Sequence, residues 1–120
     1  MKTIRFFLAV AFVSSLVSGL TACAETNPAL DNIEAIIDVR TPEEFAEGHL
    51  QGAINIDVQS ADFEKRIGEL DETAHYYIYC RSGRRSEIAH EKMIALGFTK
   101  VADLGSLEDA ATVTSLPIVR

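Results

Sequence analysis

The chain has 120 residues, 48% of them hydrophobic and 24% charged, which is the composition of a single globular domain. With 7 Gly, 3 Pro and 2 Cys, it is neither collagen-like nor a disulfide-stabilised miniprotein. The formal net charge of −7 argues against nucleic-acid binding, because proteins of that class neutralise phosphates with basic side chains.

Residues 1–22 differ from the rest of the chain. They contain Lys2 and Arg5 but no acidic residue, and an apolar run extends from Phe6 to Val17. A basic start followed by a short apolar run is typical of an export signal, and this run is too short to predict a membrane-spanning helix. Removing these residues takes two of the 11 basic side chains and none of the 18 acidic ones, which leaves a net charge of −9.

Two cleavage sites fit the end of this signal peptide. The segment Leu20-Thr21-Ala22-Cys23 resembles the lipobox of bacterial lipoproteins, whereas Ala22-Cys23-Ala24 fits ordinary cleavage after Ala24. We favour lipidation of Cys23, because a cysteine directly after Leu-Thr-Ala at the end of an apolar run is uncommon by chance. The two or three acyl chains added there would anchor the protein stably. Both alternatives place the protein in the cell envelope on the periplasmic side. It would be lipid-anchored there, with the outer membrane favoured by Ala24, or soluble.

The remainder divides into a flexible, polar tether over residues 23–32 and one domain over 33–120. Within the domain, short apolar strands alternate with amphipathic helices. Strands are expected at 34–39, 53–56, 75–79 and 100–104, and helices at 42–47, in the segment after Ser60, and at 86–96. Helical crossovers between strands predict a mainly parallel sheet, in which a ligand binds at the carboxyl ends of the strands.

Local signals set the ends of these helices. Thr41 is expected as the N-cap of the first helix, with Pro42 at its first position and Glu44 reaching back as a capping box. Ser60 is expected to cap the second helix, which would bury Phe63, Ile67 and Leu70 on one face, and Gly97 is expected to end the third.

The segment that carries chemistry is Cys80-Arg81-Ser82-Gly83-Arg84-Arg85-Ser86, between the third strand and the third helix. Backbone N–H groups in such a loop can form an anion-binding cradle, and Gly83 permits its tight curvature. The cradle, the helix N-terminus and the three arginines all favour a thiolate at Cys80, and the thiolate is the nucleophile. The alternative is a structural cysteine beside a solvated arginine run.

This loop resembles the active-site loop of the rhodanese sulfurtransferases. The segments Ile37–Phe45 and Gly48–Ile56 resemble the upstream signature of that family, and Gly97–Val101 with Leu104-Gly105 resembles its closing strand. The resemblance covers about residues 35–110, and the short exported single-domain form of the family is the most similar in organisation. It implies an α/β rhodanese fold, with a small, mainly parallel sheet flanked by helices and the active-site loop at a strand end.

The resemblance also implies a mechanism. Cys80 would take the outer sulfur of thiosulfate or of a persulfide and pass it to a thiol or cyanide. Residues 81–85, which are Arg81, Ser82, Gly83, Arg84 and Arg85, would supply the cradle and attract the small anionic donor. Asp38, paired with Arg40 or with the cradle N–H groups, would support the loop. We expect neither a metal nor an organic cofactor, a membrane contact through the lipid anchor alone, no nucleic-acid partner, and a monomer.

His49 and the C-terminal part of the motif need separate interpretation. His49 could act as a base but is better explained as a packed, hydrogen-bonded histidine. The family often closes with Leu-x-Gly-Gly and a Trp, whereas this chain has Leu104-Gly105-Ser106 and no Trp, so its pocket wall is expected to differ.

Two other functional classes remain open. Phosphatases and arsenate reductases of related fold carry an arginine six positions after the cysteine, whereas here Arg85 is five positions after Cys80, so that class is the least favoured. The second class is a non-enzymatic persulfide carrier or a redox-sensing interaction module, since an exposed cysteine of low pKa is also oxidisable.

Overall fold

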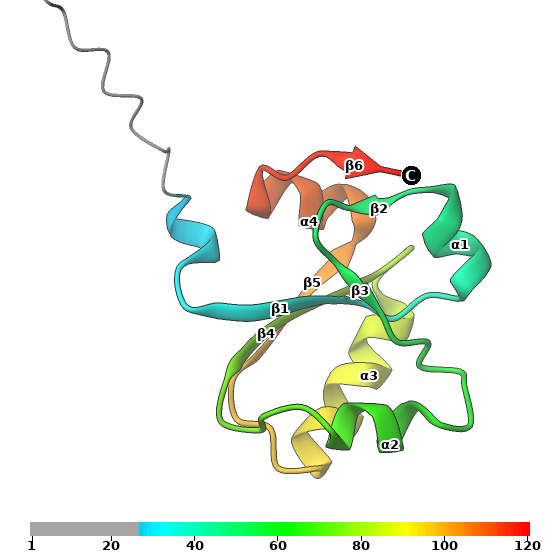
Figure 1. The fold of residues 1–120 in the computed structure, drawn as a ribbon, viewed down its shortest axis with the longest axis vertical. Coiled ribbons are helices and arrows are strands. Elements are labelled where there is room, and N and C mark those ends of the chain that lie inside the picture. Colours follow the sequence, from blue (N-terminus) through cyan, green and yellow to red (C-terminus); the bar gives the residue numbers. More distant parts are fainter. Residues whose placement is uncertain (1–26) are drawn as a thin grey trace, which may run out of the picture.

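The computed structural model describes residues 27–120; the predicted signal peptide and Cys23 lie outside the described residues. In chain order the elements are η1 (Pro28–Leu30), β1 (Ile33–Asp38), α1 (Pro42–Glu47), β2 (His49–Leu50), β3 (Ile54–Asn55), α2 (Phe63–Gly68), β4 (His75–Cys80), α3 (Arg84–Ala95), β5 (Val101–Ser106), α4 (Leu107–Thr114) and β6 (Ile118–Val119). Figure 1 shows how they are arranged.

Four strands form the main sheet in the order β3-β1-β4-β5, and every pairing is parallel. Ile37 of β1 lies between Ile54 of β3 and Ile78 of β4, so the apolar centres of the strands are in register. The predicted parallel sheet is therefore confirmed. β1 and β4 occupy the centre, and their carboxyl ends bring Asp38 and Cys80 to the same edge.

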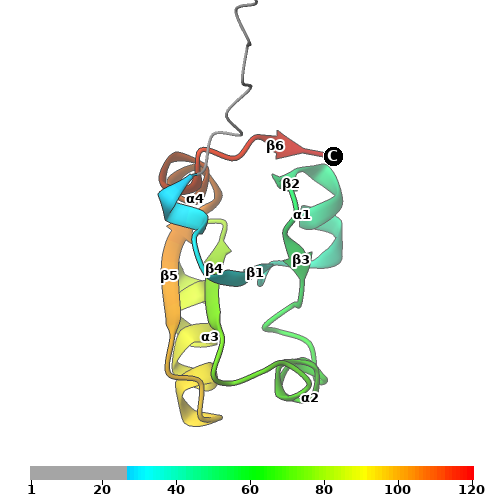
Figure 2. The ribbon, with the colours of Figure 1, turned by 60° about the vertical axis from the view of Figure 1, so that its left-hand side comes forward.

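The sheet is covered on both faces, as a parallel sheet requires. One apolar cluster contains Ile37, Ile78 and Cys80 together with Phe63 and Ile67 of α2 and Ala89 and Met93 of α3. A second cluster contains Ile36 and Tyr79 together with Leu50 and Ala110 of α4. Neighbouring residues of β1 and β4 thus point to opposite faces, which is the period of two expected of a strand. In Figure 2, α3 runs alongside β4 and β5, whereas α4 lies at the upper end of β5.

A two-stranded antiparallel ribbon joins β2 to the C-terminal strand β6, with His49 opposite Val119 and Leu50 opposite Ile118. Neither strand was predicted, because two-residue strands have no readable periodicity. The helix α4 was not predicted either. Ser106 caps it by accepting a hydrogen bond from the Asp109 N–H at 3.1 Å. This C-terminal segment covers one side of the edge where Cys80 lies.

Several predicted boundaries move in the structure. Thr41 caps α1 as expected, accepting from the Glu44 N–H at 3.2 Å. The second helix begins after Asp62, and Ser60 makes a turn in front of it, so the cap predicted at Ser60 is wrong. The third helix begins at Arg84, two residues before the predicted start.

The described end of the predicted tether packs on the domain. Residues 28–30 form η1, Leu30 packs with the second apolar cluster, and the Tyr77 hydroxyl donates to the Ala29 carbonyl. The Asn27 amide donates to the Thr114 carbonyl. The flexible tether predicted over residues 23–32 is therefore wrong for residues 27–30, which contact the domain. No helix of the described part is long and apolar enough to span a bilayer.

Candidate active site

Cys80 is the last residue of the central strand β4 and is followed by a tight loop and then by α3. Gly83 has a φ of 96°, a left-handed conformation that favours glycine. A Cβ atom built at Gly83 would lie 3.6 Å from the Cα of Gly105, so the loop also approaches the end of β5 closely. Ser106 pairs with Cys80 across β4 and β5, which sets the first turn of α4 beside the cysteine.

The Cys80 sulfur has hydrogen-bond partners in the loop and in the first turn of α3. The Gly83 N–H donates to Sγ at 2.9 Å, as a cradle of backbone N–H groups predicts. The thiol is 3.5 Å from the Ser86 hydroxyl oxygen, and that hydroxyl donates to the Gly83 carbonyl at 3.0 Å. Ser86 can turn its single proton toward the sulfur once Cys80 loses its own.

Opposing effects act on the Cys80 thiol. Burial raises its pKa, but hydrogen bonds from the Ser86 hydroxyl and from the backbone N–H groups of Ser86, Gly83 and Ser82 lower it by more, so the net pKa lies below the ordinary value. The thiolate charge also attracts Arg85 and is among the causes that raise the pKa of that arginine, after its hydrogen bond to Glu44. The loop therefore favours the nucleophilic form of the cysteine.

The structure corrects one expectation about this cysteine. The redox-sensing alternative assumes an exposed cysteine, but Cys80 has no exposed area and belongs to the apolar cluster beneath α3. The loop residues Arg81 and Ser82 above it are exposed. A sulfur donor must therefore enter the loop before its outer atom can touch Sγ.

The three loop arginines differ in their partners. Arg85 is held by Glu44, with Nη1 to Oε1 at 2.6 Å and Nη2 to Oε2 at 2.9 Å. This two-point contact fixes α1 against α3, and the hydrogen bond from Arg85 is the main cause that lowers the pKa of Glu44 to about 2. Arg81 and Arg84 are exposed and make no ion pair within residues 27–120.

These contacts change the predicted roles. The guanidinium fork of Arg85, expected to orient substrate oxygens, is occupied by a carboxylate, so it braces the loop. Arg81 and Arg84 remain free to attract an anion. Glu44 does not close a capping box on the Thr41 backbone, because its carboxylate is taken by Arg85 and by the Thr41 hydroxyl.

A buried ion pair lies at the carboxyl end of the neighbouring strand β1. The Arg40 Nη2 lies 2.6 Å from the Asp38 Oδ2, and both side chains are almost fully buried. Arg40 also donates to the Gly48 carbonyl, while the Asn55 amide donates to the carbonyls of Asp38 and Arg40. Of the two partners considered for Asp38, the structure shows Arg40.

His49 has a structural role. Its Nδ1 is 2.7 Å from the Phe45 carbonyl, and the two rings stack with centroids 3.6 Å apart. The prediction of a packed, hydrogen-bonded histidine is confirmed. The described residues also contain no cluster of His, Cys, Asp and Glu suited to a metal ion.

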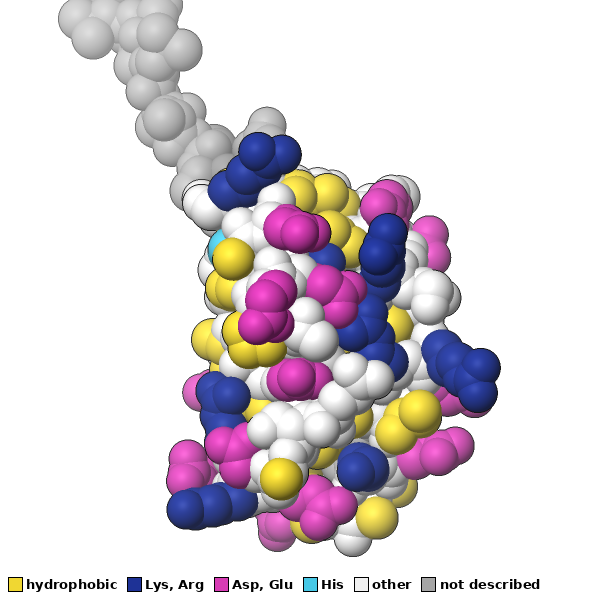
Figure 3. Space-filling view, turned by 90° about the vertical axis from the view of Figure 1, so that its right-hand side faces the viewer, with side chains coloured by type: hydrophobic (Ala, Val, Ile, Leu, Met, Phe, Trp, Pro, Cys, Tyr) yellow, Lys and Arg dark blue, Asp and Glu magenta, His cyan; other side chains and the backbone are white. Residues whose placement is uncertain are grey.

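A hollow of about 240 Å³ adjoins the loop. Its lining includes Arg81 of the loop, Glu44 of α1, and Leu107, Glu108 and Ile118 of the C-terminal segment. On the face that carries α1, basic, acidic and apolar side chains lie interspersed (Figure 3).

Sequence reasoning missed some residues of this site. Ser86 was read as part of the helix, although a hydroxyl one turn into a helix that follows a nucleophile can reach back to it. Asn55 and Glu108 carried no local signal, because strand pairing and the packing of α4 bring them to the site.

The family model for the rhodanese-like domain matches residues 23–109. The chain belongs to the rhodanese-like family. Its fold is the rhodanese fold, with the cysteine of the active-site loop at the end of a central parallel strand.

Rhodanese-like relatives of known structure and name are similar over most of the domain. The solved structure described as rhodanese with anions from E. coli superposes with a TM-score of 0.60 and 34% identity, covering 72% of this chain and 96% of that one. Thiosulfate sulfurtransferase PspE of Escherichia coli (strain K12) is 37% identical over 75 residues, which are 62% of this chain and 72% of PspE.

The putative sulfur carrier protein YrkF of Bacillus subtilis (strain 168) is 44% identical over 69 residues. The match takes in 58% of this chain but only 36% of YrkF, so the chain spans about a third of that relative.

Proposed function

We propose that this rhodanese-like protein is a thiosulfate sulfurtransferase that works through a persulfide on Cys80. The observation that carries the proposal is the buried Cys80 sulfur, which accepts from the Gly83 N–H at 2.9 Å and has a lowered pKa. The free arginines Arg81 and Arg84 suit a small dianionic donor. PspE, whose name states this activity, supports thiosulfate as the donor, and a relative whose structure is described as rhodanese with anions supports an anionic ligand.

In the first half-reaction the Cys80 thiolate attacks the outer sulfur of thiosulfate. A new S–S bond forms, the S–S bond of thiosulfate breaks, and sulfite leaves with the bonding pair. The outer sulfur then carries the negative charge within the loop, where backbone N–H groups and the Ser86 hydroxyl can stabilise it. In the second half-reaction cyanide or a thiolate attacks this sulfur, and Cys80 leaves again as the thiolate.

The test is transfer of sulfur from thiosulfate to cyanide, measured as thiocyanate. Cys80→Ser should abolish transfer while keeping the circular dichroism spectrum of the folded protein. Cys23→Ser, which replaces the other cysteine of the chain, should retain full activity. Residual transfer above about a tenth of wild type in Cys80→Ser would exclude the covalent scheme.

A persulfide carrier is the second candidate, favoured by the similarity to YrkF. A carrier would accept sulfur on Cys80 and release it to one protein partner, with slow turnover on small acceptors. Rapid multiple turnover with thiosulfate and cyanide would favour the enzyme, whereas a single stoichiometric charge of sulfur without turnover would favour the carrier.

We propose also that the protein is exported and lipidated at Cys23, on the strength of Leu20-Thr21-Ala22-Cys23 in the sequence. Mass analysis of the N-terminus in the membrane fraction tests this. A diacylated or triacylated Cys23 is expected, whereas an unmodified start at Glu25 would indicate a soluble periplasmic protein. Cleavage after Ala24 would leave the contacts of residues 27–32 intact, so the released domain should remain active.

A further inference from the structure

The hollow beside the Cys80 loop carries both signs of charge. Arg81 links it to the loop, because this residue follows Cys80 directly in the chain. Other lining residues come from the end of α1, the first turn of α4 and β6. They are Glu47, Leu107, Glu108 and Ile118. These residues line the surface beside the Cys80 loop on this side.

Only some of these charges are neutralised. Arg40 and Glu44, which also line the hollow, are held by Asp38 and Arg85 at 2.6 Å. Arg81, Glu47 and Glu108 form no ion pair within the described part of the chain. The hollow therefore has one free positive charge beside the cysteine and two free carboxylates.

The donor and the acceptor meet different parts of this charge distribution. The sulfur donor is a dianion, which Arg81 and Arg84 on the loop attract. Once sulfite has left, the persulfide anion carries the same single negative charge as the thiolate before it, and the two carboxylates remain free. An acceptor that enters through the hollow passes Glu47 and Glu108, which repel anionic thiols and attract cationic ones.

We infer that the preferred acceptor is a small thiol that carries an ammonium group, bound with the ammonium at Glu47 and Glu108. Leu107 and Ile118, the latter 49% exposed, supply an apolar wall for its methylene groups. This inference rests on the proposed function and names the acceptor class for the same site.

The transfer step balances without an added oxidant or reductant. The acceptor thiol gives its proton to solvent, and its thiolate attacks the outer persulfide sulfur. One S–S bond forms and one breaks, Cys80 leaves as the thiolate, and the acceptor departs as a persulfide.

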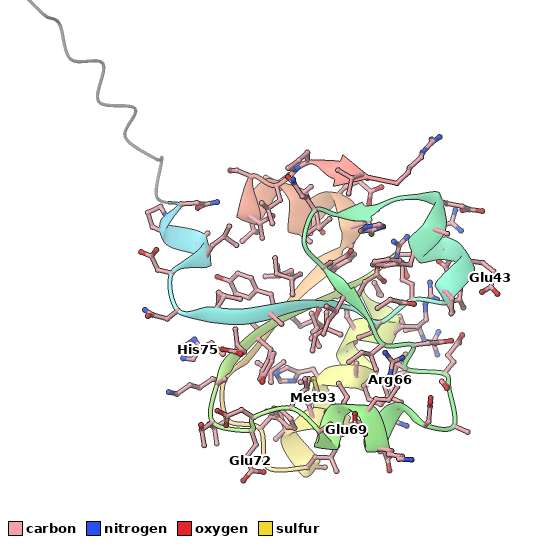
Figure 4. All side chains as sticks on the ribbon, viewed as in Figure 1. Glu43, Arg66, Glu69, Glu72, His75 and Met93 are labelled. Atoms are coloured by element: carbon pink, nitrogen blue, oxygen red, sulfur yellow. The ribbon has the colours of Figure 1, made fainter. Side chains whose placement is uncertain are left out.

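The experiment starts from enzyme charged with sulfur by thiosulfate and freed from excess donor. Its discharge is followed with cysteamine, 2-mercaptoethanol and 3-mercaptopropionate, which are cationic, neutral and anionic. Intrinsic thiol reactivities differ, so each variant is compared with wild type for one acceptor at a time. The variants are Glu47→Gln, Glu108→Gln and the double variant. Glu72→Gln is the matched control, because Glu72 lies at the other end of the sheet (Figure 4).

A carboxylate roughly 7 Å from an ammonium changes the rate constant about threefold in water, so two together give about tenfold. The double variant should discharge to cysteamine about tenfold more slowly, to 2-mercaptoethanol at the wild-type rate, and to 3-mercaptopropionate faster. Glu72→Gln should change none of these rates. Equal effects on all three thiols, or no effect, would overturn the inference. Failure of thiosulfate to charge Cys80 would instead refute the proposed function, and the inference with it.

Discussion

Replacing Glu44 by Gln should destabilise the domain by about 2 kcal/mol at pH 7. The structure gives the upper bound, because the pKa of Glu44 falls from 4.5 to about 2 and each pKa unit corresponds to about 1.4 kcal/mol. That product is about 3 kcal/mol. The side chain is 22% exposed, so solvent screens part of the interaction with Arg85 and lowers the expected value.

The effect should depend on pH in one direction. A carboxyl group whose pKa is lowered by folding stabilises the fold fully above its unfolded pKa, here about 4.5. The contribution is lost as the pH falls toward about 2. The difference between Glu44→Gln and wild type should therefore be largest near neutrality and small at pH 2.

Urea unfolding followed by circular dichroism measures this difference. Glu43→Gln is the matched control, because Glu43 lies in the same first turn of α1 but makes no ion pair among the described residues. It should change the free energy of unfolding by less than about 0.5 kcal/mol. A cost for Glu44→Gln equal to that of Glu43→Gln, or a cost independent of pH, would refute the claim that Glu44 and Arg85 brace the loop.

Substitutions of Asp38, Ser86 and Arg84 test other parts of the site. Asp38→Asn should cost about 3–5 kcal/mol in urea unfolding, because it leaves the buried Arg40 charge without its partner; a cost below about 1 kcal/mol would contradict this. Ser86→Ala should move the ultraviolet titration of the Cys80 thiolate up by about one pH unit, since it removes a hydrogen bond to the charged sulfur; an unchanged titration would count against that bond. Arg84→Ala should raise the KM for thiosulfate, more strongly at low salt; a lower kcat at constant KM would instead place Arg84 in transition-state stabilisation.

The catalytic loop was predictable because its signals are local. A β-branched and aromatic strand, Cys80, the left-handed Gly83 and an amphipathic helix follow one another between His75 and Ala95, and each has a physical meaning without tertiary context. The parallel sheet followed from alternating strands and helices. Thr41 and Pro42 likewise predicted the start of α1, because N-capping involves only neighbouring residues.

What escaped prediction depends on contacts between distant segments. Arg85 meets Glu44 across 41 positions of sequence, so no local pattern distinguishes it from Arg84. The burial of Cys80 follows from the close approach of Gly83 and Gly105 and from α3 packing on the sheet. The strands β2 and β6 stabilise each other, and neither has a signal of its own.

The central claim is that Cys80 carries the transferred sulfur. Intact mass spectrometry of the purified protein after incubation with thiosulfate tests it most directly. We expect a gain of one sulfur atom located on Cys80, release of one equivalent of sulfite, and loss of the added mass on treatment with cyanide. An unchanged mass with the protein folded, or sulfur on any other residue, would contradict it.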